Sequence, residues 1–279
     1  MIAMDGEMMS DGPTDDEATG GETTDEETTD GETTTEGSDR SEASVGRDHD
    51  PIATYDRIAA HFSKTREYAW PEVESFLANR TAVRAIDVGC GNGRHTELLA
   101  DRADAAVGVD ASRGLLAEAR TRAADRGVDA SFLQGDAATL PVATDAADLG
   151  VYVATVHHLR PRRRRVRSLN ELARVLAPEG IALVSTWSTA HDRFADVDPV
   201  ADADVRAVTG ADGTPIGFDT TVDWTLPGGE TVPRFYHIYT PDGFRADLAA
   251  SDLSVESFEV SSGNCYVTVR PSDGDAPKE

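Results

Sequence analysis

The residues whose identity and arrangement most clearly indicate a chemical role lie between Ala82 and Arg94, a stretch that reads AVRAIDVGCGNGR. Three glycines occupy alternate positions there, after a short apolar run (83–88) that predicts a buried parallel strand. The stretch 94–102 that follows is helical in character. Glycines let a backbone approach a ligand closely, and the first N–H groups of a helix can bind an anion. The stretch therefore predicts the front of a nucleotide-binding βαβ unit.

The spacing of the glycines selects among the possible ligands. A dinucleotide fingerprint requires G-x-G-x-x-G, whereas here the sixth position is Arg94 and the last glycine comes one place earlier. An acid followed by G-x-G-x-G instead resembles motif I of the class I S-adenosylmethionine methyltransferases, whose loop holds the cationic amino-acid end of the cofactor. This resemblance implies a cofactor role for Asp87, Gly89, Gly91 and Gly93. The alternative is a glycine-rich turn in another α/β domain.

Two further acids follow later strands in the expected register. Asp110 ends the predicted strand 105–109, and an acid about 20 residues after the glycines is placed for the two hydroxyl groups of a ribose. Asp110 could cap the next helix at the same time. Asp136 follows the predicted strand 130–133 and, by the same resemblance, would receive the adenine amino group. We expect the cofactor site to be completed by Tyr55, Ala137 and Val153.

The residues expected around the methyl-transfer point indicate the kind of acceptor. Methyl transfer requires a nucleophile held in line with the methyl group. Neither Cys90 nor Cys265 is placed to attack a pyrimidine carbon, and ATVHH stands where enzymes that methylate exocyclic amines usually carry an N-P-P-Y type sequence. A carboxylate or phenol needs little base, so such a site would mainly neutralise and orient an anion. The available side chains are Arg66, His157, His158, Arg234 and His237, and among the histidines we favour His158 and His237.

Alternation along the segment 234–240, RFYHIYT, separates two of these candidates. Arg234 and Tyr236 should point to one face of a strand, and Phe235 and His237 to the other. A guanidinium is a planar fork that matches two carboxylate oxygens. We therefore rank Arg234 above His237 as the group that, with Arg66, clamps the substrate.

Several longer segments occur in one order: YDRIAAHFSKTR with WP shortly after, IDVGCGNGR, VHHL before an arginine-rich run, RFYHIY and GNCYV. Together they resemble the family that methylates 5-carboxymethyluridine at the tRNA wobble position, over roughly 52–190 and 224–269. The family favours an aromatic residue at the position of Cys265. The resemblance implies a small zinc-binding activator protein on the edge strand ASFLQ (130–134). It also implies a substrate side lined by Arg66, Trp70, His158, Arg234, Tyr236 and His237.

An arginine-rich run, RPRRRRVR, opens the predicted helix 161–177. Cations at a helix N-terminus oppose the helix dipole, at a cost of a few tenths of a kcal/mol each. Their concentration in an otherwise acidic chain suggests a binding site for tRNA phosphates. We therefore take Arg162, Arg163, Arg164 and Arg165 as substrate-binding candidates, the alternative being a solvated helix face.

These elements predict a Rossmann-like class I methyltransferase fold, a mostly parallel seven-stranded sheet with an antiparallel last strand. We expect one methyltransferase domain over 51–270. Residues 188–233 lack clear periodicity and are expected to cap the active-site end of the sheet, after which 234–240 returns to the core. Further strands are expected at 148–153, 181–187, 254–260 and 265–270, and helices at 55–62, 71–79, 112–126 and 242–250.

Charge and composition set the general class of protein. Residues 1–50 hold 17 of the 51 acidic residues and few large apolar ones, which predicts a disordered acidic tail. A second disordered tail is expected over 271–279. The rest of the chain is also acidic, and Lys64 and Lys278 are its only lysines. This composition is typical of halophilic proteins from a salt-rich cytoplasm. No apolar run could span a membrane and the cysteines form no metal cluster, so we expect a cytoplasmic protein without a metal.

Three functions remain open from the residues. The first is a tRNA wobble-uridine carboxyl methyltransferase that uses S-adenosylmethionine. The second is a small-molecule O- or C-methyltransferase with a quinone-like or carboxylate substrate, which would have no use for the arginine run. The third is a non-catalytic, cofactor-binding subunit, which the intact set of Asp87, Asp110 and Asp136 argues against.

Overall fold

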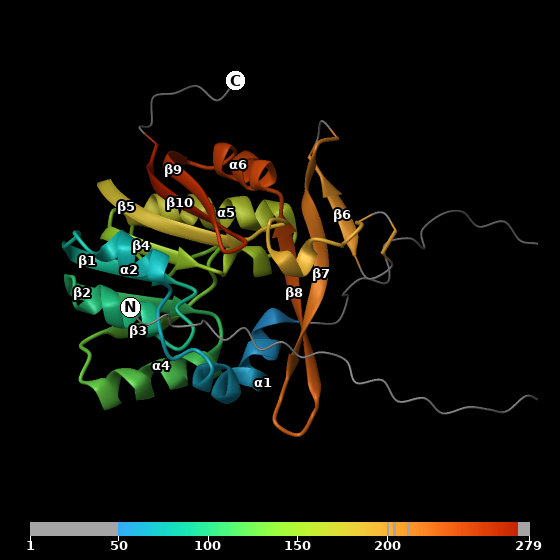
Figure 1. Ribbon diagram of the computed structural model, residues 1–279. Helices are drawn as coiled ribbons and strands as arrows, with labels where there is room; N and C mark the ends of the chain where they lie inside the picture. Colours follow the sequence, from blue (N-terminus) through green and yellow to red (C-terminus); the bar gives the residue numbers. More distant parts are fainter. Residues whose placement is uncertain (1–49, 200, 203–204, 211–212, 273–279) are drawn as a thin grey trace, which may run out of the picture. The chain divides into compact units, whose positions relative to one another are not determined.

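The computed structural model describes residues 50–199, 201–202, 205–210 and 213–272. Figure 1 shows the helices and strands of these residues. The two predicted tails, 1–50 and 271–279, lie outside the described residues except at Asp50, Pro271 and Ser272. No helix in the described part of the chain combines the length and apolarity needed to cross a membrane.

The main sheet has the strand order β3-β2-β1-β4-β5-β10-β9. Strands β1 to β5 pair in parallel, and β10 runs antiparallel to both of its neighbours. The predicted fold class is therefore confirmed. The strands are β1 (Ala82–Val88), β2 (Ala103–Asp110), β3 (Ser131–Gln134), β4 (Ala147–Val153), β5 (Leu176–Trp187), β9 (Leu253–Ser261) and β10 (Asn264–Pro271).

Helices cover both faces of this sheet (Figure 1). Three of them begin where a side chain caps the first turn: Asp50 accepts from the Ile52 N–H, Ser112 from the Leu115 N–H, and Thr240 from the Gly243 N–H. The α-helices are α1 (Pro51–Lys64), α2 (Pro71–Leu77), α3 (Arg94–Ala100), α4 (Arg113–Arg126), α5 (Arg162–Val175) and α6 (Pro241–Ala249), and the 3-10 turns are η1 (Val156–His158) and η2 (Asp192–Phe194).

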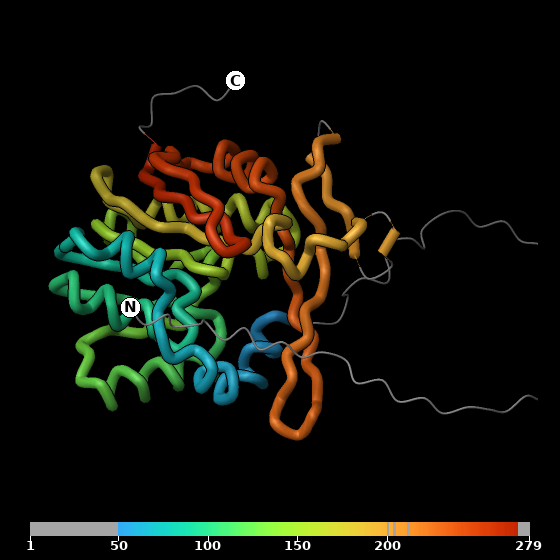
Figure 2. The backbone as a smooth tube through the Cα atoms, in the orientation of Figure 1, coloured from blue at the N-terminus to red at the C-terminus, as the bar shows by residue number. Residues whose placement is uncertain are grey.

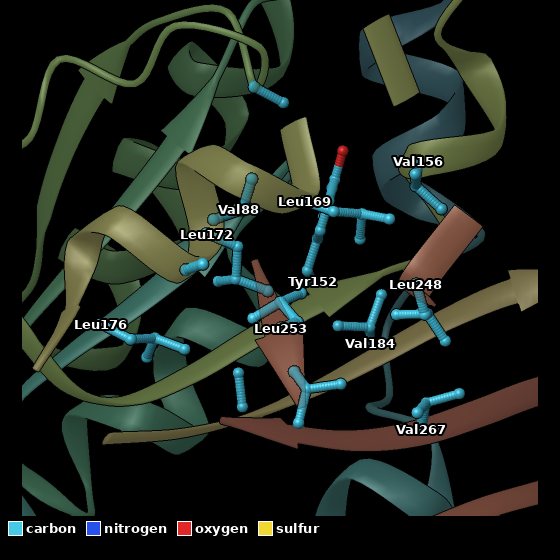
Figure 3. Close-up of a cluster of buried hydrophobic side chains, with 14 of the residues drawn as sticks. Val88, Tyr152, Val156, Leu169, Leu172, Leu176, Val184, Leu248, Leu253 and Val267 are labelled. Atoms are coloured by element: carbon cyan, nitrogen blue, oxygen red, sulfur yellow. The ribbon is translucent and has the colours of Figure 1, made fainter. Parts of the chain in front are cut away.

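The core has two layers because the central strands are buried on both faces. On one face, Leu169 and Leu172 of α5 and Leu248 of α6 pack with Val184 and Val267 of the sheet, as Figure 3 shows. On the other face, α2 and α3 pack on β1, β4 and β5. This double burial explains why the central strands of the sequence read as continuous apolar runs rather than as alternating ones.

A second sheet with the order β6-β7-β8 lies beyond the main one. It consists of β6 (Arg206–Thr209), β7 (Pro215–Thr225) and β8 (Thr231–Tyr239). Residues 234–240, expected to return to the core, therefore belong largely to this second sheet and pair with β7. The β7–β8 hairpin runs along α1, as the tube in Figure 2 also shows, and Trp224 Nε1 donates to His61 Nδ1 at 3.1 Å.

A buried carboxylate explains part of the unusual arginine run at the start of α5. Asp247 of α6 is fully buried, and it accepts from Arg162 Nε at 2.5 Å and from the Tyr239 hydroxyl at 2.7 Å. Arg165, also buried, lies 3.5 Å from the same carboxylate. The charge of Asp247 offsets both the burial of Arg165 and the unfavourable helix dipole. Two of the four arginines thus join α5 to α6 and β8.

Removal of this charge should destabilise the domain. Asp247→Asn keeps the shape of the side chain but leaves Arg165 buried without a counter-ion, so we expect unfolding to become easier by about 3–5 kcal/mol in urea titrations. A matched control is Asp148→Asn, whose partner Arg84 is half exposed and whose loss should cost less than about 1 kcal/mol. Equal stability changes in the two variants would contradict the assignment.

Candidate active site

A cavity of about 250 Å³ lies at the carboxyl ends of β1, β2 and β4, the edge at which open α/β sheets bind ligands. Its walls come from the loops that follow these strands, and residues 50–62 of α1 close one side. The sequence-predicted residues that line it are Tyr55, Gly89, Gly91, Asp110, Asp136, Ala137, Val153, His158 and Arg164.

The glycine loop brings bare backbone to the cavity. Gly89 has a φ of +69°, and a Cβ placed on it would lie 2.3 Å from the side chain of Thr155. Only glycine fits both constraints. Gly93, by contrast, does not line the cavity; it precedes the first turn of α3 with a φ of 78°. Gly89 therefore accommodates the Thr155 side chain, Gly91 leaves open space at the cavity, and Gly93 starts the helix.

Asp110 lines the cavity at the end of β2, and its carboxylate is fixed from two sides. One oxygen accepts from the Gly91 N–H and the other from the Ser112 N–H, each at 2.8 Å. Burial raises the pKa of Asp110, and these two N–H groups oppose the rise. The next turn is tied to α1, since Asp56 accepts from the Ser112 hydroxyl at 2.5 Å and from the Gly114 N–H at 2.8 Å.

Asp136 lines the cavity beyond β3 and pairs with Arg164. The Ala138 N–H donates to its other oxygen at 2.9 Å. Arg164 thus belongs to the cavity wall. Of the other arginines proposed for tRNA, Arg165 is buried and cannot reach a phosphate, and Arg163 is exposed. The four arginines therefore do not form one common surface.

Asp87 lies behind the glycine loop rather than in the cavity wall. It is buried and accepts from Thr96 Oγ1 at 2.7 Å, which ties β1 to α3. Burial raises the pKa of this carboxyl to about 7, against the effect of the Thr96 bond. His95, which the sequence reasoning missed, does line the cavity. Its Nε2 is buried without a hydrogen-bond partner among the described residues.

Tyr55 and His158 form a wall of the cavity between α1 and η1. His158 Nδ1 lies 2.8 Å from the carbonyl oxygen of Phe235, which can only accept, so Nδ1 carries the proton. Nε2 then accepts from the Tyr55 hydroxyl at 3.0 Å. Burial lowers the pKa of His158 to about 4, so the imidazole is neutral at physiological pH. The hydrogen bond in this wall therefore joins two neutral side chains, and His158 has a defined tautomer.

Two arginines lie next to this wall over one indole ring. The guanidinium carbon of Arg234 lies 4.9 Å from the ring centroid of Trp224, and that of Arg66 lies 5.5 Å from it. Arg234 Nη1 donates to the Tyr236 hydroxyl at 2.8 Å, while Arg234 Nε is buried without a partner among the described residues. Neither arginine forms an ion pair within the described part of the chain.

His237 and Trp70 lie in other surroundings. His237 Nδ1 contacts Asp219 at 2.7 Å, and its ring packs edge-on against Tyr239 at 4.4 Å. It is on the opposite face of β8 from Arg234, as strand alternation predicts, which leaves it away from the arginine pair. The Trp70 ring packs between His95, at 6.5 Å, and Tyr266, at 6.1 Å, close to the cavity.

The cavity fits the expected cofactor. Asp110 and Asp136 both present carboxylates to this cavity, as their expected roles toward a ribose and an adenine require. His95 Nε2 adds a buried polar atom that a ligand could satisfy. Sequence reasoning missed two lining residues, Asn92 within the glycine motif and His95 two residues after it, so their position was the available signal. No group of three or more His, Cys, Asp or Glu in the described residues is arranged to hold a metal ion.

The pKa of Asp87 gives a pH prediction for cofactor binding. A cationic ligand binds better when this carboxyl is ionised, so affinity for S-adenosylmethionine should rise as the pH increases through about 7 and then level off. Calorimetric titrations between pH 6 and 8 measure this dependence. Asp87→Asn should lose most of the rise, and an identical rise in that variant would contradict the role of Asp87.

Sequence comparisons identify relatives of this chain. A family model described as "Methyltransferase domain" matches residues 85–180. The chain is 36% identical to the tRNA (carboxymethyluridine(34)-5-O)-methyltransferase of Saccharomyces cerevisiae, over 48% of this chain and 46% of that protein. It is 36% identical to the corresponding Mus musculus protein ALKBH8, over 48% of this chain and 19% of that protein. These matches span a fifth to about half of the relatives' lengths. A putative methyltransferase of Encephalitozoon cuniculi is 32% identical over 68% of this chain and 80% of its own length.

Structure comparisons agree on the fold. The CcbJ methyltransferase of Streptomyces caelestis superposes with a TM-score of 0.63 at 17% identity, covering 81% of this chain and all of that one. A putative methyltransferase in complex with the Trm112 methyltransferase activator of Haloferax volcanii gives a TM-score of 0.56 at 14% identity, covering 82% and 100%. At these identities the likeness concerns the fold alone.

Proposed function

Since this chain belongs to the S-adenosylmethionine-dependent methyltransferase family that includes the tRNA carboxymethyluridine methyltransferases, we propose that it methylates the carboxyl group of 5-carboxymethyluridine at the tRNA wobble position. Two of its relatives are named as methyltransferases of that nucleoside, and the methyltransferase family model matches residues 85–180, which include the glycine loop and much of the cavity wall. The cofactor is S-adenosylmethionine.

The arginine pair is the observation that carries the proposal. Arg66 and Arg234 both lie over the indole ring of Trp224, and neither has an acidic ion-pair partner among the described residues. Burial lowers the pKa of Arg66, and the nearby charge of Arg234 lowers it further. The Arg234 side chain is buried and that of Arg66 is half-buried, and two nearby cations in such surroundings repel each other unless an anion lies between them. A carboxylate is the anion whose two oxygens best match the guanidinium fork.

The chemistry of the site also favours a carboxylate acceptor. S-adenosylmethionine, when bound, supplies an electrophilic methyl group. A carboxyl group with an ordinary pKa near 4 is already ionised at neutral pH, so no base has to remove a proton. The neutral His158, whose Nε2 accepts from Tyr55, is arranged to support that wall rather than to take a proton. Arg66 and Arg234 would hold the acceptor oxygen, and Tyr236 would orient Arg234 through its hydroxyl.

Fewer arginines beside the cavity are available to contact RNA phosphates than the sequence suggested. Arg163 is exposed at the start of α5, one residue before the cavity-lining Arg164. We assign Arg163 to a phosphate contact, and Arg162 and Arg165 to the internal contact with Asp247. A tRNA substrate also implies a cytoplasmic location. The acidic, lysine-poor composition favours a halophilic setting, so assays should include high salt.

A protein partner is part of the proposal. β3 is the edge strand of the main sheet, and an edge strand can pair with another chain. Leu133 on this strand is 38% exposed. One structural neighbour is a complex between a Trm112 activator and a putative methyltransferase. We infer that a small activator protein, which by family resemblance binds zinc, covers β3.

Arg234→Lys tests the carboxylate assignment. Lysine keeps the charge but loses the fork, so methylation of tRNA that carries carboxymethyluridine should slow about 10- to 100-fold, with cofactor affinity unchanged. Methyl groups transferred from labelled S-adenosylmethionine should be released as methanol in mild alkali, because the product is an ester. Arg80→Lys is the matched control, since Arg80 packs on Phe76, an aromatic ring outside the cavity. Wild-type turnover by Arg234→Lys, or an alkali-stable product, would overturn the assignment.

Leu133→Asp tests the partner. A charge on the exposed edge should weaken binding of a co-purified activator at least tenfold, which would appear as separation of the two proteins on size-exclusion chromatography. Val260→Asp is the matched control, because Val260 is 43% exposed on β9 at the other edge of the sheet. Loss of the partner in both variants or in neither would argue against β3 as the contact.

A further inference from the structure

Tyr68 is the most exposed large hydrophobic side chain in the described residues. It is 82% exposed, whereas every other aromatic side chain in the described part of the chain is buried or half-buried. It belongs to no apolar patch, because the other exposed large apolar side chains lie on α1, β1, β3 and β9. An isolated exposed ring does not resemble the centre of a protein interface, which is an extended apolar area.

The loop that presents this ring is firmly held. Residues 66–70, which connect α1 and α2, contain no regular hydrogen-bonded structure, yet three consecutive carbonyl groups each accept from a side chain. Asn92 Nδ2 donates to the Arg66 carbonyl at 3.0 Å, Arg122 Nη2 to the Glu67 carbonyl at 2.8 Å, and Arg94 Nη1 to the Tyr68 carbonyl at 3.0 Å. Binding surfaces work best when they are ordered in advance, because less entropy is lost on binding.

The loop also places Tyr68 next to the substrate side. Arg66, two residues earlier, is one of the two arginines proposed to hold the carboxylate, so the two Cα atoms are at most about 7.6 Å apart. Arg94, which binds the Tyr68 carbonyl, lines the cavity. The cations next to the loop favour an anionic ligand, since Arg94 contacts Tyr68 and the acid next to Tyr68 in the sequence, Glu67, is already paired with Arg126.

We propose that Tyr68 stacks on an unpaired nucleobase beside the nucleotide whose carboxylate occupies the arginine pair. This inference rests on the proposed function and names a further contact of the same site. Proteins recognise single-stranded RNA loops by stacking unpaired bases on aromatic rings, with cationic side chains along the backbone. A loop held by three hydrogen bonds, one exposed ring and the cations Arg66 and Arg94 supply these elements beside the cavity. The anticodon loop, which contains the wobble position, is such a single-stranded segment.

Binding of a labelled anticodon stem–loop, followed by fluorescence anisotropy, tests the proposal. Tyr68→Ala should raise the Kd about 5- to 150-fold, the range observed for loss of one base–aromatic stack. Tyr68→Phe keeps the ring and should bind like wild type. Binding of a perfectly paired duplex should not change in either variant. Val83→Ala is the control, since Val83 is 60% exposed at the amino end of β1, opposite the cavity.

The outcomes separate this inference from the proposed function. If wild type forms the methyl ester on tRNA but Tyr68→Ala has an unchanged Kd and KM, the stacking proposal is wrong and the function stands. If Tyr68→Ala weakens loop binding selectively but wild type forms no ester, the stacking proposal stands and the function fails. Equal weakening by Tyr68→Phe and Tyr68→Ala, equal loss on duplex and loop, or no binding of the loop RNA by wild type would each overturn the stacking proposal.

Discussion

Two guanidinium groups held over one indole, with no acidic ion-pair partner among the described residues, are the constraint on which the architecture of this site depends. Cations in partly buried surroundings are costly unless their environment compensates them. The π faces of Trp224 and Tyr236 and the hydroxyl of Tyr236 provide part of that compensation. An anionic ligand can supply the rest of the compensation. The same arrangement of charges that is costly for the free protein can therefore favour carboxylate binding.

The two arginines reach this place from separate parts of the chain. Arg66 follows α1, before the first strand of the main sheet, and Arg234 lies in β8 of the second sheet. The second sheet therefore has a direct role, because β8 brings Arg234 and Tyr236 to the end of α1. The strand pairs with β7, and its last residue is held behind the site, where Tyr239 donates to the buried Asp247 of α6. Stability of the domain and placement of the substrate groups thus depend on the same strand.

The cofactor side and the substrate side share one wall. Tyr55 and His158 line the cavity, and the Phe235 carbonyl, one residue from Arg234, fixes the tautomer of His158. α1 carries Tyr55 and is also tied to the turn after Asp110 through Asp56 and Ser112. Hydrogen bonds from Ser112 and Gly114 to Asp56 therefore hold α1 against the turn that follows Asp110, beside the cavity.

Much of the main sheet and the cofactor side could be predicted, because parallel strands place their carboxyl ends at one edge. Asp110 was selected by its distance from the glycines and Asp136 by the family resemblance, and both line the cavity. Alternation along β8 places Arg234 and His237 on opposite faces of the strand. The second sheet was not predicted as such, since β6 and β7 lack a clear period. The roles of Arg162 and Arg165 depend on Asp247, about 80 residues away in sequence, and the only signal for His95 was its place just after the glycine motif. Contacts of that range follow from tertiary packing, which local patterns do not encode.

Nucleoside mass spectrometry of tRNA from a strain that lacks this protein tests the central claim most directly. The tRNA should be hydrolysed at neutral pH, because alkali would cleave the ester. The account predicts that the methyl ester of 5-carboxymethyluridine at the wobble position disappears and that the free carboxylate accumulates in its place, with both restored by the wild-type chain. An unchanged amount of the methyl ester in the deletion strain would contradict the account.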